Sequence, residues 1–215
     1  RWMLSGWFEA GVQGDDEPML AAAVRLLVVV LADQGGDGGG EFLVAEDRLF
    51  FVNDADQDVY VRKLARGEPV LRLTSLRHTR FGDFAWDRPR NRLICIGETH
   101  DPNHGRMPEN ALWSIPGDAS GATSAPCKLI CGRDFYASPR MSPDGAMLAF
   151  LTWSLPSMPW DEAELVVAEL AADGTPGAIK TVAGGSGSAC FQPEWSADGS
   201  LYFVWDADGW GNLFR

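Results

Sequence analysis

A short apolar pattern recurs about every fifty residues, and this repeat restricts the fold more than any other feature of the sequence. Each copy is a run of aliphatic, β-branched or aromatic residues that follows a turn. The first leucine of each copy falls at Leu49, Leu93, Leu148 and Leu201, with separations of 44, 55 and 53 residues. Periods of this length are typical of repeat architectures, in which each copy forms one structural unit.

Three further columns recur around these markers. A downstream column contains Val59-Tyr60, Leu112-Trp113, Leu165-Val166 and Leu213-Phe214. An upstream column contains Ala85-Trp86-Asp87, Arg140-Met141-Ser142 and Glu194-Trp195-Ser196. A weaker column closes three units at Val70–Leu73, Lys128–Ile130 and Ile179–Val182. Four short strands in each unit are the signature of a β-propeller blade.

The turns support the same interpretation. Ser142-Pro143-Asp144-Gly145 and Ser196-Ala197-Asp198-Gly199 place turn-forming residues between the first and second strands. We therefore predict an all-β fold, a partial β-propeller of about three and a half four-stranded blades. The predicted blades span residues 38–75, 80–131, 134–183 and 189–215, the last one incomplete, and residues 1–37 remain unassigned.

Both ends of the chain look cut, because it begins with Arg1 and stops directly after an apolar Leu213-Phe214 pair. The apolar segment Leu26–Ala32 could supply a strand that pairs with the incomplete last blade and closes the ring. We treat this closure as a minority hypothesis.

Charge and composition exclude several classes of function. The chain has 215 residues with 18 Lys+Arg and 30 Asp+Glu, a net charge of −12. An acidic chain repels nucleic acids and anionic membrane surfaces, so we expect neither as a partner. The most apolar run, residues 19–32, is too short for a membrane helix and contains Arg25. We expect a cytoplasmic protein with four reduced cysteines and no cofactor.

Two segments carry a resemblance to a known family. They are Leu151–Asp161 (LTWSLPSMPWD) and Phe191–Gly199 (FQPEWSADG). Weaker support comes from Asn53–Gln57, Asp83–Asp87, Ala137–Gly145 and Gly209–Leu213. Over residues 38–215 the sequence resembles the propeller domain of serine peptidases of the prolyl oligopeptidase family. Within it, the acylaminoacyl-peptidase and dipeptidyl-aminopeptidase-like branch is most similar.

The resemblance implies a role in peptide hydrolysis. In that family the propeller caps a C-terminal α/β-hydrolase domain that holds a Ser-Asp-His triad. The sequence has no Gly-x-Ser-x-Gly nucleophile elbow. We therefore assign no catalytic residue and expect the chain alone to be inactive. It would gate access of a peptide substrate to the absent hydrolase domain. The alternative is a non-enzymatic propeller, like that of the periplasmic Tol system, acting as a protein- or ligand-binding scaffold.

Candidate contact residues lie in two insertions. His100 and His104 flank an inserted loop and could touch substrate, although exposed loop histidines more often have no role. Trp153 and Trp160 bracket a proline-rich loop that ends at Asp161. These tryptophans either anchor a substrate or partner, or pack the loop against its blade.

We assign no chemical function to two other groups of residues. The Asp54-x-Asp56-x-Asp58 series lacks the glycine and the glutamate of a calcium loop and is interpreted as a solvated turn. Trp86, Met141 and Trp195 share one repeat column and are interpreted as blade-interface core.

Overall fold

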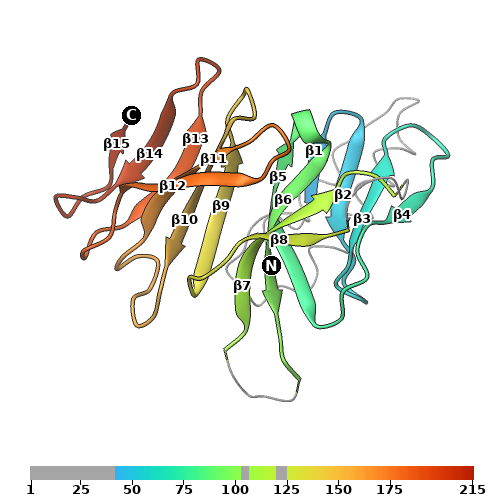
Figure 1. The fold of residues 1–215 in the computed structure, drawn as a ribbon, viewed down its shortest axis with the longest axis horizontal. Helices are drawn as coiled ribbons and strands as arrows, with labels where there is room; N and C mark the ends of the chain where they lie inside the picture. The colour runs from blue at the N-terminus through green and yellow to red at the C-terminus, as the bar shows by residue number, and fades with distance from the viewer. Residues whose placement is uncertain (1–41, 103–106, 120–124) are drawn as a thin grey trace, which may run out of the picture.

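The computed structural model describes residues 42–102, 107–119 and 125–215, which form successive antiparallel sheets in chain order (Figure 1). The first sheet contains β1 (Phe42–Ala45), β2 (Arg48–Val52), β3 (Val59–Lys63) and β4 (Val70–Arg72). The second contains β5 (Thr79–Asp87), β6 (Arg92–Thr99), β7 (Glu109–Pro116) and β8 (Cys127–Ile130). The third contains β9 (Phe135–Met141), β10 (Met147–Trp153), β11 (Glu164–Leu170) and β12 (Pro176–Ala183). The fourth contains β13 (Cys190–Trp195), β14 (Leu201–Trp205) and β15 (Asn212–Phe214).

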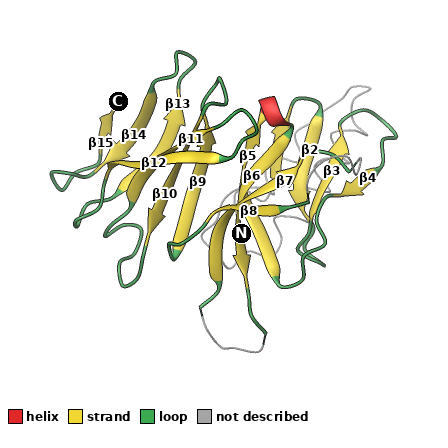
Figure 2. Ribbon diagram, in the orientation of Figure 1, coloured by secondary structure: helices red, strands yellow, loops and turns green. Residues whose placement is uncertain are grey.

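Within each sheet every strand pairs with its neighbour in sequence, and the repeat columns fall on equivalent strands. The four marker leucines lie on β2, β6, β10 and β14, the second strand of each sheet. A short 3-10 helix, η1 (Arg88–Arg90), is the one helical element among the described residues (Figure 2). The predicted fold class, an all-β partial propeller, is confirmed. The segment 1–37, the possible closing strand at 26–32 and residues 38–41 lie outside the described residues.

The apolar core lies between the sheets. On β10, Leu148 and Phe150 pack toward the second sheet, whereas Ala149 and Leu151 pack toward the fourth. Because successive strand residues point to opposite faces, one strand serves two interfaces. A similar cluster joins the first two sheets and contains Phe50 and Leu93, both fully buried. Trp86, Met141 and Trp195 are partly buried and pack against these three clusters, one each.

The first strands of the sheets lie next to one another. β1 contacts β5, β5 contacts β9, and β9 contacts β13. These strands are therefore the inner edges of the fan, while β4, β8 and β12 form its outer edges. No helix within the described ranges is long and apolar enough to cross a membrane.

An ionic clasp joins the second and third sheets at the end that carries the first-to-second strand turns. The Asp87 carboxylate is fully buried and pairs with Arg90 at 3.0 Å and Arg92 at 2.7 Å. Arg90 also donates to the carbonyl oxygens of Ala171 and Gly145, at 2.7 and 2.9 Å. One buried carboxylate thus positions two guanidinium groups that bind the backbone of the neighbouring sheet.

The Ser196–Gly199 turn shows how the turn residues that recur between first and second strands act. Asp198 accepts hydrogen bonds from the Ser196 hydroxyl and from the Ser200 backbone N–H. Gly199 adopts a φ of +82°, which favours glycine. The hydrogen bond from Ser196 and the other bonds to the carboxylate lower the pKa of Asp198 to about 2.

Replacing Asp198 by Asn should therefore change how the free energy of unfolding depends on pH in the acidic range. A folded-state pKa below the ordinary value means that ionised Asp198 stabilises the fold above the ordinary pKa, and that this contribution disappears as pH falls toward 2. Urea unfolding should show Asp198→Asn less stable than the parent at pH 6, with the difference shrinking as pH approaches 2. A difference that stays constant over this range would contradict the assignment.

Replacing Asp87 by Ala should strongly destabilise the chain, by about 3–5 kcal/mol, because two partly buried arginines lose their carboxylate. The matched control is Asp47→Ala. The Asp47 side chain is 72% exposed and lies 3.9 Å from Arg48, so its loss should cost no more than about 0.5 kcal/mol. Urea unfolding of both variants measures the difference, and equal losses would rule out the clasp as a stabilising element.

Candidate functional site

A concave region of about 1440 Å³ lies along the inner strands. Its wall comes mainly from β5 and β9, with contributions from the first and fourth sheets and from the β10–β11 loop. This placement follows from the topology, because the inner strands converge and leave their exposed side chains facing a shared space. Concave, largely apolar sites with a few polar groups are the usual form of ligand sites.

A β-bulge recurs at the same place in three inner strands. On β5, β9 and β13, two residues oppose one residue of the second strand. The first residue of each bulged pair has positive φ, with values of 53° at Asp83, 51° at Ser138 and 50° at Gln192. Asp83 and Ser138 line the cavity. Bulges bend a strand and redirect its side chains, and left-handed residues other than glycine often mark functional positions.

A chain of polar contacts crosses the cavity wall at these bulges. The Asp83 carboxylate accepts a hydrogen bond from the Ser138 backbone N–H at 2.5 Å and lies 3.7 Å from Arg140. Arg140 donates in turn to Glu194 at 2.9 Å, and its carbonyl oxygen accepts from the Trp195 indole at 3.0 Å. Burial raises the pKa of Asp83, and the Ser138 and Arg140 contacts offset part of that rise. These contacts link three successive sheets.

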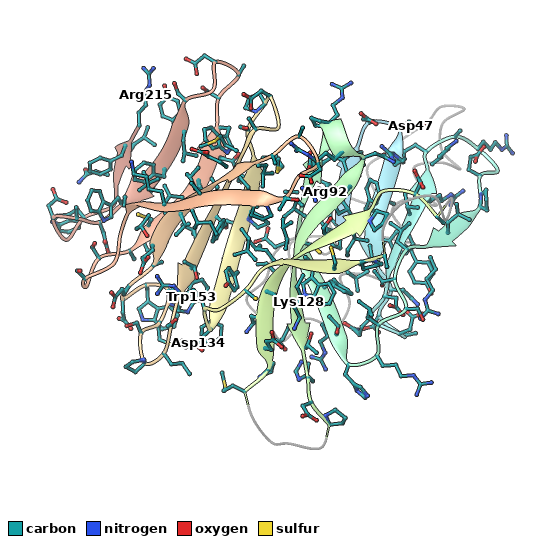
Figure 3. The ribbon with its side chains drawn as sticks, in the orientation of Figure 1. Asp47, Arg92, Lys128, Asp134, Trp153 and Arg215 are labelled. Atoms are coloured by element: carbon teal, nitrogen blue, oxygen red, sulfur yellow. The ribbon has the colours of Figure 1, made fainter. Side chains whose placement is uncertain are left out.

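Aromatic side chains form another part of the wall. Phe135 and Trp153 are cross-strand partners whose rings stack with centroids 5.3 Å apart. Figure 3 shows Trp153 near Asp134, at the end of the third sheet that carries the β10–β11 loop. Met158 and Trp160 of that loop line the same cavity. The arrangement can hold an apolar group beside charged and amide side chains.

The structure brings some of the sequence-predicted residues together. Trp153 and Trp160 both line the cavity. Asp161 orders the loop instead, since its carboxylate accepts from the Met158 N–H at 3.2 Å. His100 follows β6 and its Nε2 lies 2.5 Å from Glu98 Oε1. Glu98 lines the cavity, whereas His100 does not. His104 lies outside the described residues. A functional role for these five residues stays a prediction.

Sequence reasoning missed the charged residues of the inner strands. Arg80, Asp83 and Arg140 line the cavity, although the sequence pattern predicts only blade strands around them. The available signal was a charged residue beside the large apolar residue of the upstream column, as in Arg140-Met141 and Glu194-Trp195. In the part of the chain that the structure describes, Arg80 has no ion-pair partner.

Several other polar groups have structural roles. In the 53–58 turn, Asp56 accepts from the Tyr60 hydroxyl at 2.6 Å, and buried Asp58 binds Arg72 and Thr74. Within the described ranges no three His, Cys, Asp or Glu side chains gather as a metal site would require. Burial raises the pKa of Cys190 to about 11 and raises that of Cys95. Both thiols are thus protonated at neutral pH and poorly nucleophilic.

The bulge at Asp83 yields a test of the cavity wall. Asp83→Ala should destabilise the chain by about 1–3 kcal/mol, because the partly buried Ser138 N–H loses its acceptor. Asp83→Asn should lose less stability than Asp83→Ala, since the Asn side chain supplies an acceptor and Asn tolerates positive φ. Urea unfolding of the two variants at pH 7 separates these outcomes. Equal losses for Ala and Asn would show that the Ser138 contact contributes little.

Comparison with solved structures finds this arrangement in peptidases. The chain is 32% identical to a Mycobacterium tuberculosis puromycin-hydrolyzing peptidase, with a TM-score of 0.71 over 83% of this chain. It is 31% identical to puromycin hydrolase, with a TM-score of 0.69 over 77% of this chain. It spans 29% and 26% of the lengths of those two proteins.

More distant similarity concerns the fold alone. Prolyl oligopeptidase B from Galerina marginata is 13% identical, with a TM-score of 0.50 over 75% of this chain and 24% of that chain. No protein-family model matches the sequence, and no curated protein matches it. The antiparallel sheets in chain order and the 31–32% identity to two peptidases both support the same resemblance. The resemblance drawn from the sequence is therefore confirmed: over about four fifths of its length the chain is similar to peptidases of the prolyl oligopeptidase family, and its four-stranded sheets fit a propeller.

Proposed function

We propose that this chain is the non-catalytic propeller portion of a serine peptidase and that it gates the access of peptides to an α/β-hydrolase domain absent from the chain. The observation that carries the proposal is the cavity on the inner strands, in a chain 31–32% identical to puromycin-hydrolysing enzymes. A cavity of about 1440 Å³ accommodates a short peptide and excludes a folded protein.

The groups on the wall suit a peptide. Arg80 and Glu98 supply opposite charges, and the Asn110 side chain supplies an amide near them. Asn110 also donates to the Asp134 carbonyl oxygen at 2.8 Å, so it is held between the second and third sheets. Aromatic and aliphatic side chains complete the surface. Polar groups of this kind can meet a peptide backbone and its termini while the apolar wall contacts side chains.

Under this proposal, the residues that cleave the peptide bond lie outside this chain. The sequence contains no nucleophile elbow. The buried thiols of Cys95 and Cys190 are held protonated. We therefore assign this chain binding and size selection, not bond cleavage. Its cytoplasmic location stays a prediction.

The proposal is tested by assaying two proteins side by side, this chain and a version extended at its C-terminus through the following coding sequence. Aminoacyl and short peptidyl p-nitroanilides should be hydrolysed by the extended protein and not by this chain. The extended protein should cleave peptides of a few residues and leave a folded protein intact. Its control is the same protein with the serine of its Gly-x-Ser-x-Gly motif replaced by alanine.

Two results would overturn the proposal. Hydrolysis by the short chain would place the catalytic centre inside it. An extended protein that carries no such motif and shows no hydrolysis would favour the alternative role of a non-enzymatic binding scaffold.

A further inference from the structure

Three large apolar side chains are exposed on one short loop between β10 and β11. Leu155 is 50% exposed, Met158 is 40% exposed and Trp160 is 60% exposed. Single exposed hydrophobic residues are ordinary on protein surfaces, whereas a contiguous group marks a contact site. The loop therefore presents apolar area that the described sheets leave uncovered.

This loop is held in place by hydrogen bonds. The Leu155 N–H donates to the Asp134 carboxylate at 2.9 Å, and the Ser157 hydroxyl donates to Glu162 at 3.1 Å. Glu162 also accepts from the Ser186 N–H at 2.7 Å, which ties the loop to the segment before β13. An ordered apolar surface loses less conformational entropy on binding than a flexible one, so it is well suited to recognition.

The loop continues the stacked rings of the neighbouring strands. We define the aromatic wall as Phe135, Trp153, Met158 and Trp160, all of which line the cavity. Phe135 and Trp153 stack with an interplanar angle of 15°, and both rings are partly exposed. Aromatic rings prefer offset stacks or edge-to-face contacts with further rings, and methionine sulfur also packs favourably on them.

We propose that the aromatic wall is a specificity-determining contact that binds an aromatic side chain of the peptide, with Trp160 as its principal residue. The proposal rests on the proposed function and adds a preference within the peptide class. A peptide fits better than an aromatic nucleotide, because the chain carries a net charge of −12 and Asp54, Asp83 and Glu98 line the same cavity. A peptide also fits better than a lipid, because charged side chains of both signs adjoin the aromatic wall.

The test is isothermal titration calorimetry of this chain with two tetrapeptides, Ala-Ala-Phe-Ala and Ala-Ala-Ala-Ala. The phenylalanine peptide should bind about tenfold more tightly than the alanine peptide, as expected for one buried aromatic contact. Trp160→Ala should reduce this ratio to about twofold or less, and Trp160→Phe should largely restore it.

The chain offers a matched control. Trp210 is 80% exposed in the β14–β15 turn and does not line the cavity. Trp210→Ala should therefore leave the tenfold ratio intact. Because Trp160 and Trp210 are both largely exposed, neither substitution removes core packing, and urea unfolding should give similar free energies for the parent and both variants.

The proposal fails if the parent binds neither peptide, if it binds both equally, or if Trp160→Ala keeps the tenfold ratio. It also fails if, in the extended protein without peptide, iodide quenches the tryptophan fluorescence of the parent and of Trp160→Phe to the same extent, since the wall would then be covered by the rest of that protein. Hydrolysis by the extended protein without any aromatic preference would overturn this inference and leave the proposed function standing. If the extended protein hydrolyses nothing but still binds aromatic peptides preferentially, the proposed function is overturned and this inference stands.

Discussion

The packing of each sheet against the next is the interaction on which the rest of the structure depends. A sheet of three or four short strands is barely stable alone, because one hydrophobic face needs a partner. In the second and third sheets both faces are buried, so β10 directs Phe150 to one interface and Leu151 to the other. Burying a side chain such as Phe150 contributes about 1.5–3 kcal/mol. Sheets that pack this way fan about their first strands, and the cavity is the space which those strands leave between them.

The two ends of the fan differ in how their charges are used. At the end with the first-to-second strand turns, Arg48, Arg90 and Arg92 each have 13% exposed side chains and bind carboxylates or backbone carbonyls of neighbouring segments. At the opposite end, Arg80 has no such ion-pair partner among the described residues, and Trp160 is exposed. The arginines of the first end hold neighbouring sheets together, whereas Arg80 and Trp160 at the second end are available for a ligand.

The sequence predicts the fold well because the repeat columns reflect a physical requirement. Leu93 and Leu148 recur because each second strand must fill two interfaces. The prediction of a contact role for Trp153 and Trp160 has a related basis, since an insertion with large aromatic rings must contact something, and both residues line the cavity. The bulges at Ser138 and Gln192 could not be predicted, because neither residue type announces a positive φ. The position of Arg80 on the cavity wall was equally hidden, since it depends on how the inner strands converge.

The recurring bulge also explains how a repeated scaffold yields an asymmetric site. The same two-against-one geometry places Asp83, Ser138 and Gln192 at equivalent points of three inner strands. The Asp83 carboxylate reaches the backbone of the next sheet, whereas the side chains of Ser138 and Gln192 make no equivalent bond among the described residues. The cavity wall is therefore anionic and braced at the Asp83 bulge and neutral at the Ser138 bulge, whereas Gln192 does not line the cavity. A ligand in the cavity would meet a carboxylate at the second sheet and a hydroxyl at the third, and under the proposed function this difference would let a repeated scaffold orient a peptide.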